Sequence, residues 1–203
     1  MLFRSLALRA EPPALLVDLD GELPAILGIS EPDRPGVADW MASDAPPEHL
    51  VDLLVELDTK THLLPYRLGH RPPPRPMRDE GRLPDALGWL RGWEHAHSGH
   101  VVIDAGTGDP PEALLAAERN LLITRNCYLG VSRASRSAHS PGGIVLIEEP
   151  GRSLTARDIE LAVGAPIVTR LSWETDIARA VDAGLLRGRL PKVIDRAFKR
   201  SAA

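Results

Sequence analysis

Short, continuous runs of apolar residues alternate along this chain with segments in which apolar residues recur at helical spacing. Such runs are typical of strands that are buried on both faces of a parallel sheet. The alternation predicts an α/β fold, with a mostly parallel sheet, right-handed crossovers and helices on both faces. The predicted strands are residues 14–17, 62–64, 100–103, 120–124, 143–147 and 166–169, and the predicted helices are residues 37–41, 83–93, 111–118, 128–138, 156–163, 175–183 and 192–199.

Three segments do not fit this alternation directly. Residues 2–10 have apolar residues and arginines at helical spacing before a proline pair, which indicates the end of a helix. Residues 49–56 are apolar over too short a stretch to distinguish a helix from a strand. Residues 69–84 are rich in proline, which predicts an extended surface loop. We expect residues 1–203 to form one domain that includes this loop.

Composition narrows the class of protein. Apolar residues make up 43% of the chain and charged residues 26%, as in ordinary globular proteins, whereas the 4% of aromatic residues argues against a base-stacking or sugar-binding surface. The net charge of −4 gives no overall attraction to nucleic acid. Cys127 is the single cysteine and cannot form an internal disulfide, and no run reaches the roughly 18 apolar residues of a spanning helix. We therefore expect a cytoplasmic protein.

Aspartates follow two of the predicted strands. Asp18 and Asp20 come at the end of the first strand, and Asp104 ends the strand at residues 100–103. Because the carboxyl ends of parallel strands form the ligand crevice of an open sheet, these carboxylates should lie near one another. Acidic groups there suit a hydrated Mg²⁺. The alternative is that each aspartate caps the turn or helix after it.

The order of several motifs resembles the MinD/ParA group of P-loop ATPases, in the SIMIBI class, and within it a CpaE/MinD-like actinobacterial type. The resemblance begins in FRSLALRA and LLVDLDG, and it continues in PGVADWM, VVIDAGTG, TRNCYLGVSRA, TARDIELAVGAPIV and DIARAVDAGLL. It implies that Asp20 is catalytic and, with Asp104, binds the metal. It also implies that Asp18, Asp104 and Gly106 contact the cofactor, which in this family is ATP with Mg²⁺.

The resemblance also implies a biological role. Proteins of the MinD/ParA group are nucleotide-dependent positioning or partitioning factors, so we expect a homodimer with a protein partner. Contact with DNA or a membrane surface is a further expectation of the same kind, which would place a cytoplasmic protein at the membrane periphery.

One part of the family pattern is missing. No G-x-x-x-x-G-K-[ST] loop occurs in the sequence, whose lysines are Lys60, Lys192 and Lys199. Without that loop there is no cluster of backbone N–H groups for the phosphates, so we expect no ATP hydrolysis by this chain alone. The family strand that precedes the loop lies in the middle of the sheet, and we therefore expect a break beside the strand that ends at Asp104.

Two explanations of the missing loop stay open. In the first, which we favour, Met1 is an internal methionine of a longer natural protein, because FRSLALRA resembles the end of the helix that follows the loop. In the second, the protein is a family member that has lost its nucleotide loop and serves as a non-enzymatic interaction protein. Upstream DNA that encodes a strand and a phosphate loop in frame would support the first explanation, and an immediate stop codon would support the second.

The histidines, the cysteine and the tryptophans have simpler interpretations than a functional site. His95, His97 and His100 could ligate a metal, but a solvated turn is the better interpretation because no further ligands converge. Cys127 is better explained as a small buried residue than as a nucleophile. The four tryptophans are interpreted as packing anchors.

The C-terminal segment RLPKVIDRAFKR has an apolar stripe with basic residues around it. We favour packing of this stripe on the domain, with contact to an anionic membrane or to DNA phosphates as alternatives. The stripe consists of Leu190, Val193, Ile194, Ala197 and Phe198.

Overall fold

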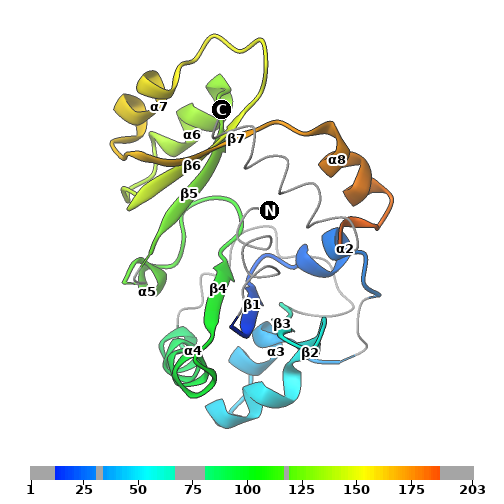
Figure 1. Cartoon of the computed structure of the whole chain (residues 1–203). Helices are drawn as coiled ribbons and strands as arrows, with labels where there is room; N and C mark the ends of the chain where they lie inside the picture. The colour runs from blue at the N-terminus through cyan, green and yellow to red at the C-terminus, as the bar shows by residue number, and fades with distance from the viewer. Residues whose placement is uncertain (1–11, 31–33, 67–80, 117–118, 188–203) are drawn as a thin grey trace.

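The computed structural model describes residues 12–30, 34–66, 81–116 and 119–187, and it shows the predicted α/β alternation (Figure 1). The strands are β1 (Ala14–Asp18), β2 (Val55–Glu56), β3 (Thr61–Leu64), β4 (His100–Asp104), β5 (Leu121–Arg125), β6 (Gly143–Glu148) and β7 (Ile167–Ser172). The helices are α2 (Leu23–Leu27), α3 (Val37–Met41), the 3₁₀ helix η1 (Pro47–Leu53), α4 (Leu83–His97), α5 (Glu112–Leu115), α6 (Tyr128–Ala134), α7 (Ala156–Val163) and α8 (Thr175–Asp182).

The strands form two sheets. Sheet A has the order β2-β3-β1-β4, in which β3, β1 and β4 are parallel and the short β2 is antiparallel to β3. Sheet B has the order β5-β6-β7 and is wholly parallel. Figure 1 shows sheet A in the lower part of the molecule and sheet B in the upper part. The prediction of mostly parallel strands is confirmed, whereas the single sheet is divided in two.

The division falls where the missing strand was expected. In the described part of the chain, β4 pairs only with β1 and β5 only with β6. The central strand β1 is fully buried, but the apolar residues 101–103 of β4 and 121–123 of β5 are only half-buried. We call this interruption between β4 and β5 the sheet break. Its position beside Asp104 matches the expectation from the sequence.

Helices cover both faces of sheet A. On one face, Leu15 and Val17 pack with Trp40 of α3, Leu50 of η1 and Leu90 of α4. These alternate residues of β1 point away from Leu16, because successive side chains of a strand lie on opposite faces.

The opposite face of sheet A is covered by α2. There, Leu16 and Leu63 pack with Leu23 and Leu27 of that helix. In sheet B, α6 and α7 cover one face, on which Ile144 contacts residues of both helices. The prediction of helices on both faces is therefore confirmed for sheet A.

Several local predictions need correction. Residues 49–56 contain both alternatives, since they include most of η1 and, after Leu54, the short strand β2. Helix α4 continues to His97, so His95 lies in its last turn and not in a solvated loop. Helix α2 was not predicted at all.

The predicted elements at residues 2–10 and 192–199, and most of the proline-rich segment 69–84, lie outside the described residues. Among the helices that are described, none combines the length and hydropathy that a membrane crossing requires.

Candidate functional site

The predicted acidic residues lie together at the carboxyl ends of β1 and β4. These strands are paired in parallel, and their register places Asp18 directly opposite Asp104. The backbone N–H of Leu19 donates a hydrogen bond of 3.0 Å to the carbonyl oxygen of Asp104, which extends the pairing past the end of β1. The sheet therefore fixes the separation of the two aspartates through backbone hydrogen bonds.

Asp18 holds the loop that follows β1. Its side chain is fully buried, and Oδ1 accepts hydrogen bonds from the backbone N–H groups of Asp20 at 3.1 Å and Gly21 at 2.8 Å. Oδ2 accepts a third hydrogen bond, of 3.0 Å, from the N–H of Leu23 at the start of α2. We call residues 18–23 the acidic loop. Both carboxylate oxygens of Asp18 thus bind backbone, as expected of a residue that caps a turn and a helix.

The environment of Asp18 also changes its acidity. Burial raises the pKa of this carboxyl group by removing water from the charged form. The three backbone donors act in the opposite direction, and the neighbouring Asp104 raises the pKa further. The net shift is upward, so burial outweighs the hydrogen bonds.

Asp20 lies against the glycine that follows β4. Gly106 has a left-handed φ of +76°, and a Cβ atom built on it would lie 2.6 Å from Cγ of Asp20. The N–H of Gly106 donates a hydrogen bond of 3.1 Å to Oδ1 of Asp104. Only glycine fits this close approach without strain. The structure therefore brings together all four residues that the sequence singled out, Asp18, Asp20, Asp104 and Gly106.

The arrangement favours two of these carboxylates over three as metal ligands. Within the described ranges, no group of three or more histidine, cysteine, aspartate or glutamate residues is placed to hold a metal ion. Asp18 accepts backbone donors at both oxygens, and Asp20 and Asp104 are half-buried beside it. Two carboxylates fit a hydrated Mg²⁺, which takes its other ligands from water and phosphate. The phosphate-binding loop itself is absent from the sequence.

A second polar cluster lies at the carboxyl ends of the sheet B strands. Asn126, which follows β5, donates from Nδ2 to the carbonyl oxygen of Glu149 at 3.2 Å and accepts from the N–H of Glu149 at 2.8 Å. The guanidinium of Arg125 lies 5.6 Å from the ring centre of Trp173, which follows β7 and is 38% exposed. Sequence reasoning missed this cluster, although a polar residue directly after an apolar strand, as Asn126 is after β5, is the signal that identified the aspartates.

Of the three histidines considered as metal ligands, His97 packs against Trp93. His97 stacks on the ring of Trp93 with centroids 4.4 Å apart, and its Nδ1 lies 2.8 Å from the carbonyl oxygen of Trp93. Cys127 is half-buried and is the N-cap of α6, where Sγ accepts from the N–H of Gly130 at 3.4 Å.

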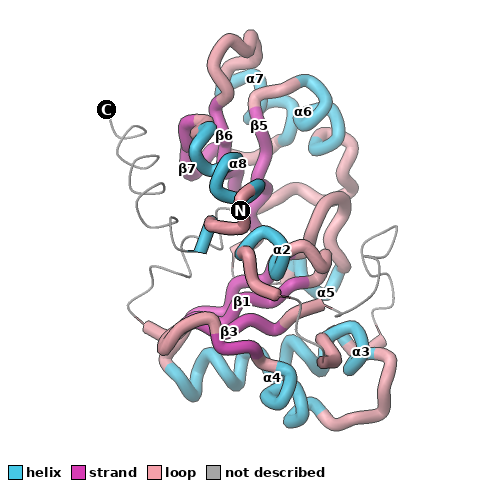
Figure 2. Tube along the Cα trace, turned by 90° about the vertical axis from the view of Figure 1, so that its right-hand side faces the viewer, coloured by secondary structure: helices cyan, strands magenta, loops and turns pink. Residues whose placement is uncertain are grey.

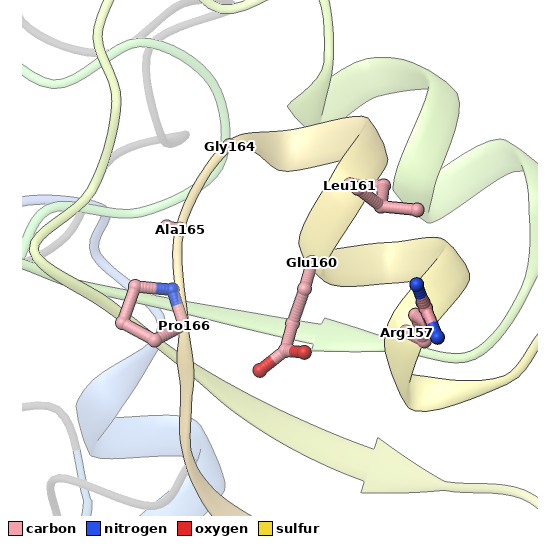
Figure 3. Close-up of a pocket in the computed structure, with 6 residues that line it drawn as sticks. All are labelled: Arg157, Glu160, Leu161, Gly164, Ala165 and Pro166. Carbon is pink, nitrogen blue, oxygen red and sulfur yellow. The ribbon is translucent and has the colours of Figure 1, made fainter.

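A hollow of about 440 Å³ lies elsewhere, between α7 and the start of β7 (Figure 3). One of its lining residues, Glu160, accepts a hydrogen bond of 2.8 Å from the N–H of Ile167. This hollow is at the amino end of β7 and contains none of the predicted site residues. Its lining is Arg157, Glu160, Leu161, Gly164, Ala165 and Pro166.

Comparison of the sequence with protein-family models and with curated proteins finds no match. The fold is similar to that of several solved structures. A ParA family ATPase from Chlorobium tepidum TLS aligns with a TM-score of 0.63 at 18% identity, over 98% of this chain and 86% of that protein. The cell division protein MinD from Aquifex aeolicus aligns with a TM-score of 0.66 at 16% identity, over 90% and 78%.

A third similar structure is an ATP complex of a McdA variant from Cyanothece, with a TM-score of 0.59 at 15% identity, over 97% of this chain and 86% of that one. These similarities define the class of fold: the chain has the α/β fold of MinD/ParA P-loop ATPases. The expectation of that fold is confirmed, and the narrower CpaE/MinD-like type stays a prediction.

Proposed function

We propose that this chain is a nucleotide-dependent positioning or partitioning protein of the MinD/ParA type. The observation that carries the proposal is the convergence of Asp20, Asp104 and Gly106 at the carboxyl edge of sheet A, within a fold shared with ParA, MinD and McdA. Carboxylates at this edge of an open α/β sheet lie where such folds bind their ligands.

Each site residue has a distinct role in this proposal. Asp104 and Asp20 would hold a hydrated Mg²⁺, and Asp20 would also orient a water molecule toward the phosphate in a complete site. Bound Mg²⁺ would neutralise charge on the phosphate oxygens of ATP. Asp18 positions the acidic loop through its three backbone hydrogen bonds, and Gly106 leaves room for Asp20.

We further propose that the chain does not hydrolyse ATP by itself. Its sequence has no phosphate loop, and hydrolysis depends on donors that cradle the β- and γ-phosphates. A nucleotide-controlled homodimer with a protein partner in the cytoplasm, or at a membrane or DNA surface, is part of the same proposal and rests on the similarity of fold.

A second candidate is a non-enzymatic interaction protein that keeps the fold. It is favoured by the engagement of both Asp18 oxygens with backbone N–H groups, together with the missing loop. This class predicts no affinity for ATP, even in a longer chain that carries a strand and a phosphate loop.

An ATPase assay tests the absence of hydrolysis. We expect the chain with Mg²⁺ to release phosphate no faster than buffer, and Asp20→Ala to leave that rate unchanged. Asp52→Ala, at an exposed position of η1, is the matched control. Turnover that Asp20→Ala abolishes and Asp52→Ala preserves would contradict the proposed inactivity and place catalysis at the acidic loop.

A further inference from the structure

Helix α2 lies between the acidic loop and the C-terminal part of sheet B. It begins at Leu23, whose N–H donates a hydrogen bond to the side chain of Asp18. It is followed by its C-cap Gly28, where the backbone is left-handed. Figures 1 and 2 both show α2 next to α8, the helix that follows β7. Of the contacts between elements of the two sheet regions in the described chain, that between α2 and α8 is the most extensive.

The two helices meet at their C-terminal ends. Gly28 has a φ of +67° and Gly184, after α8, has a φ of +64°. A Cβ atom on Gly28 would lie 1.9 Å from the carbonyl oxygen of Gly184, so a methyl group cannot fit without displacing backbone. A Cβ atom on Gly184 would have its nearest neighbour, Cα of Gly28, at 3.8 Å, an ordinary contact.

Apolar contacts reinforce this approach. Ala180 and Leu186 are buried and form a cluster with Ile26 of α2 and with Ile177 and Val181 of α8. The apolar face of α8 therefore packs on α2, although α8 follows directly from a strand of sheet B. We call this contact the α2–α8 clasp, and it consists of Ile26, Gly28, Ile177, Ala180, Val181, Gly184 and Leu186.

A helix as short as α2 takes its position from its surroundings. Its five residues are too few for independent helical stability. Three features hold α2 in place. They are the hydrogen bond from the N–H of Leu23 to Asp18, the packing of Leu23 and Leu27 on sheet A, and the clasp with α8. We therefore expect a change at any one of these contacts to affect the other two.

We propose that the α2–α8 clasp couples the acidic loop to α8, so that a change in the backbone hydrogen bonds of Asp18 alters the stability of α8, and the reverse. This coupling spans the sheet break, across which β4 and β5 are not paired within the described residues. It depends on contacts within the chain and not on the identity of a ligand, so it stands independently of the proposed nucleotide site.

Hydrogen exchange measured by mass spectrometry on the full chain tests the coupling from both ends. Gly28→Ala should accelerate exchange at least about tenfold both in α8 and in the acidic loop, because opening of the contact becomes easier by about 1.4 kcal/mol or more. Gly184→Ala is the matched control: it adds the same methyl group at the same left-handed φ but has room for it. We expect its effect to be confined to the residues around position 184.

The reverse experiment uses Asp18→Asn, which keeps the shape of the side chain but leaves one acceptor oxygen in place of two. We expect faster exchange in α8 than in the wild type, with no change there in the exposed variant Asp52→Asn. Coupling between two sites is reciprocal, so both directions must respond. If Gly28→Ala prevents folding, Ile26→Ala weakens the same clasp without a backbone clash.

The proposal is overturned if Gly28→Ala and Gly184→Ala act equally on the acidic loop. It is also overturned if Asp18→Asn accelerates exchange in the acidic loop alone and leaves α8 as in the wild type. A failure of ATP binding would bear on the proposed function and leave this coupling untouched.

Discussion

At the scale of single residues, the site depends on the close contact between the side chain of Asp20 and the backbone of Gly106, which follows β4. The backbone of Gly106 passes so close to Asp20 that a side chain on residue 106 must displace the carboxylate. In the sequence, only the family resemblance around Asp104 singles out this glycine. The contact that makes it necessary is a tertiary one.

Gly106→Ala should therefore be more destabilising than its backbone conformation alone requires. A left-handed residue with a Cβ atom costs about 1–2 kcal/mol, and crowding against Asp20 should add about 1–3 kcal/mol. Gly151→Ala is the matched control, because Gly151 has a φ of +78° and no atom within 4 Å of its added Cβ. Urea unfolding checks this prediction, and equal losses for the two variants would contradict it.

Asp18 should give the protein a pH dependence of a defined sign. Its pKa is raised above the ordinary 3.8 by burial, so the folded state holds the proton more tightly than the unfolded chain does. The contribution of Asp18 to stability therefore falls as the pH rises from below 3.8 through the raised value.

Unfolding of the wild type and Asp18→Asn across this pH range isolates the effect. We expect the free energy of unfolding of the wild type, relative to the variant, to decrease as the pH rises. An increase would show that the hydrogen bonds from Asp20, Gly21 and Leu23 outweigh burial.

At the scale of elements, most strands and helices were predictable, including the five-residue α3, but helix α2 was not. The apolar runs identify β1 and β6 because each strand is buried on both faces. Helix α2 has five residues and a proline in its first turn, so it has no periodic pattern to detect and forms because Asp18 and sheet A hold it. The end of α4 was missed because its polar histidines suggest a turn, whereas His97 stacks on Trp93.

Arg82 joins helices α3 and α4 and the loop after α3, and it gives a prediction at this scale. Its guanidinium lies 4.0 Å from the ring centre of Trp40 and donates to the carbonyl oxygens of Ser43 and Ala45, so it ties the start of α4 to the chain after α3. Arg82→Lys should destabilise the protein by about 1–2 kcal/mol, because the ammonium group of lysine cannot reproduce the planar arrangement of donors in the guanidinium group.

Arg91→Lys, at an exposed position of the same helix, is the control and should change stability by less than about 0.5 kcal/mol. Thermal or urea unfolding distinguishes the two substitutions. Similar small changes in both would show that the contacts of Arg82 contribute little.

At the scale of the whole molecule, the order of the motifs predicted both the fold and the place where the sheet is interrupted. The pairing of Asp18 with Asp104 followed from strand ends in a parallel sheet, without knowledge of any side-chain contact. The polar cluster of Asn126 and Trp173 and the α2–α8 clasp could not be predicted in this way. They depend on residues far apart in the sequence that only packing brings together.

Equilibrium dialysis with labelled ATP, with and without Mg²⁺, tests the central claim most directly, because it reports bound ATP and released ADP together. We predict Mg²⁺-dependent retention of ATP by the wild type and by Asp52→Asn, loss of retention in Asp104→Asn, and no ADP above the buffer level. Absence of retention in the wild type, or equal retention in Asp104→Asn, would contradict a nucleotide site at the carboxyl edge of sheet A.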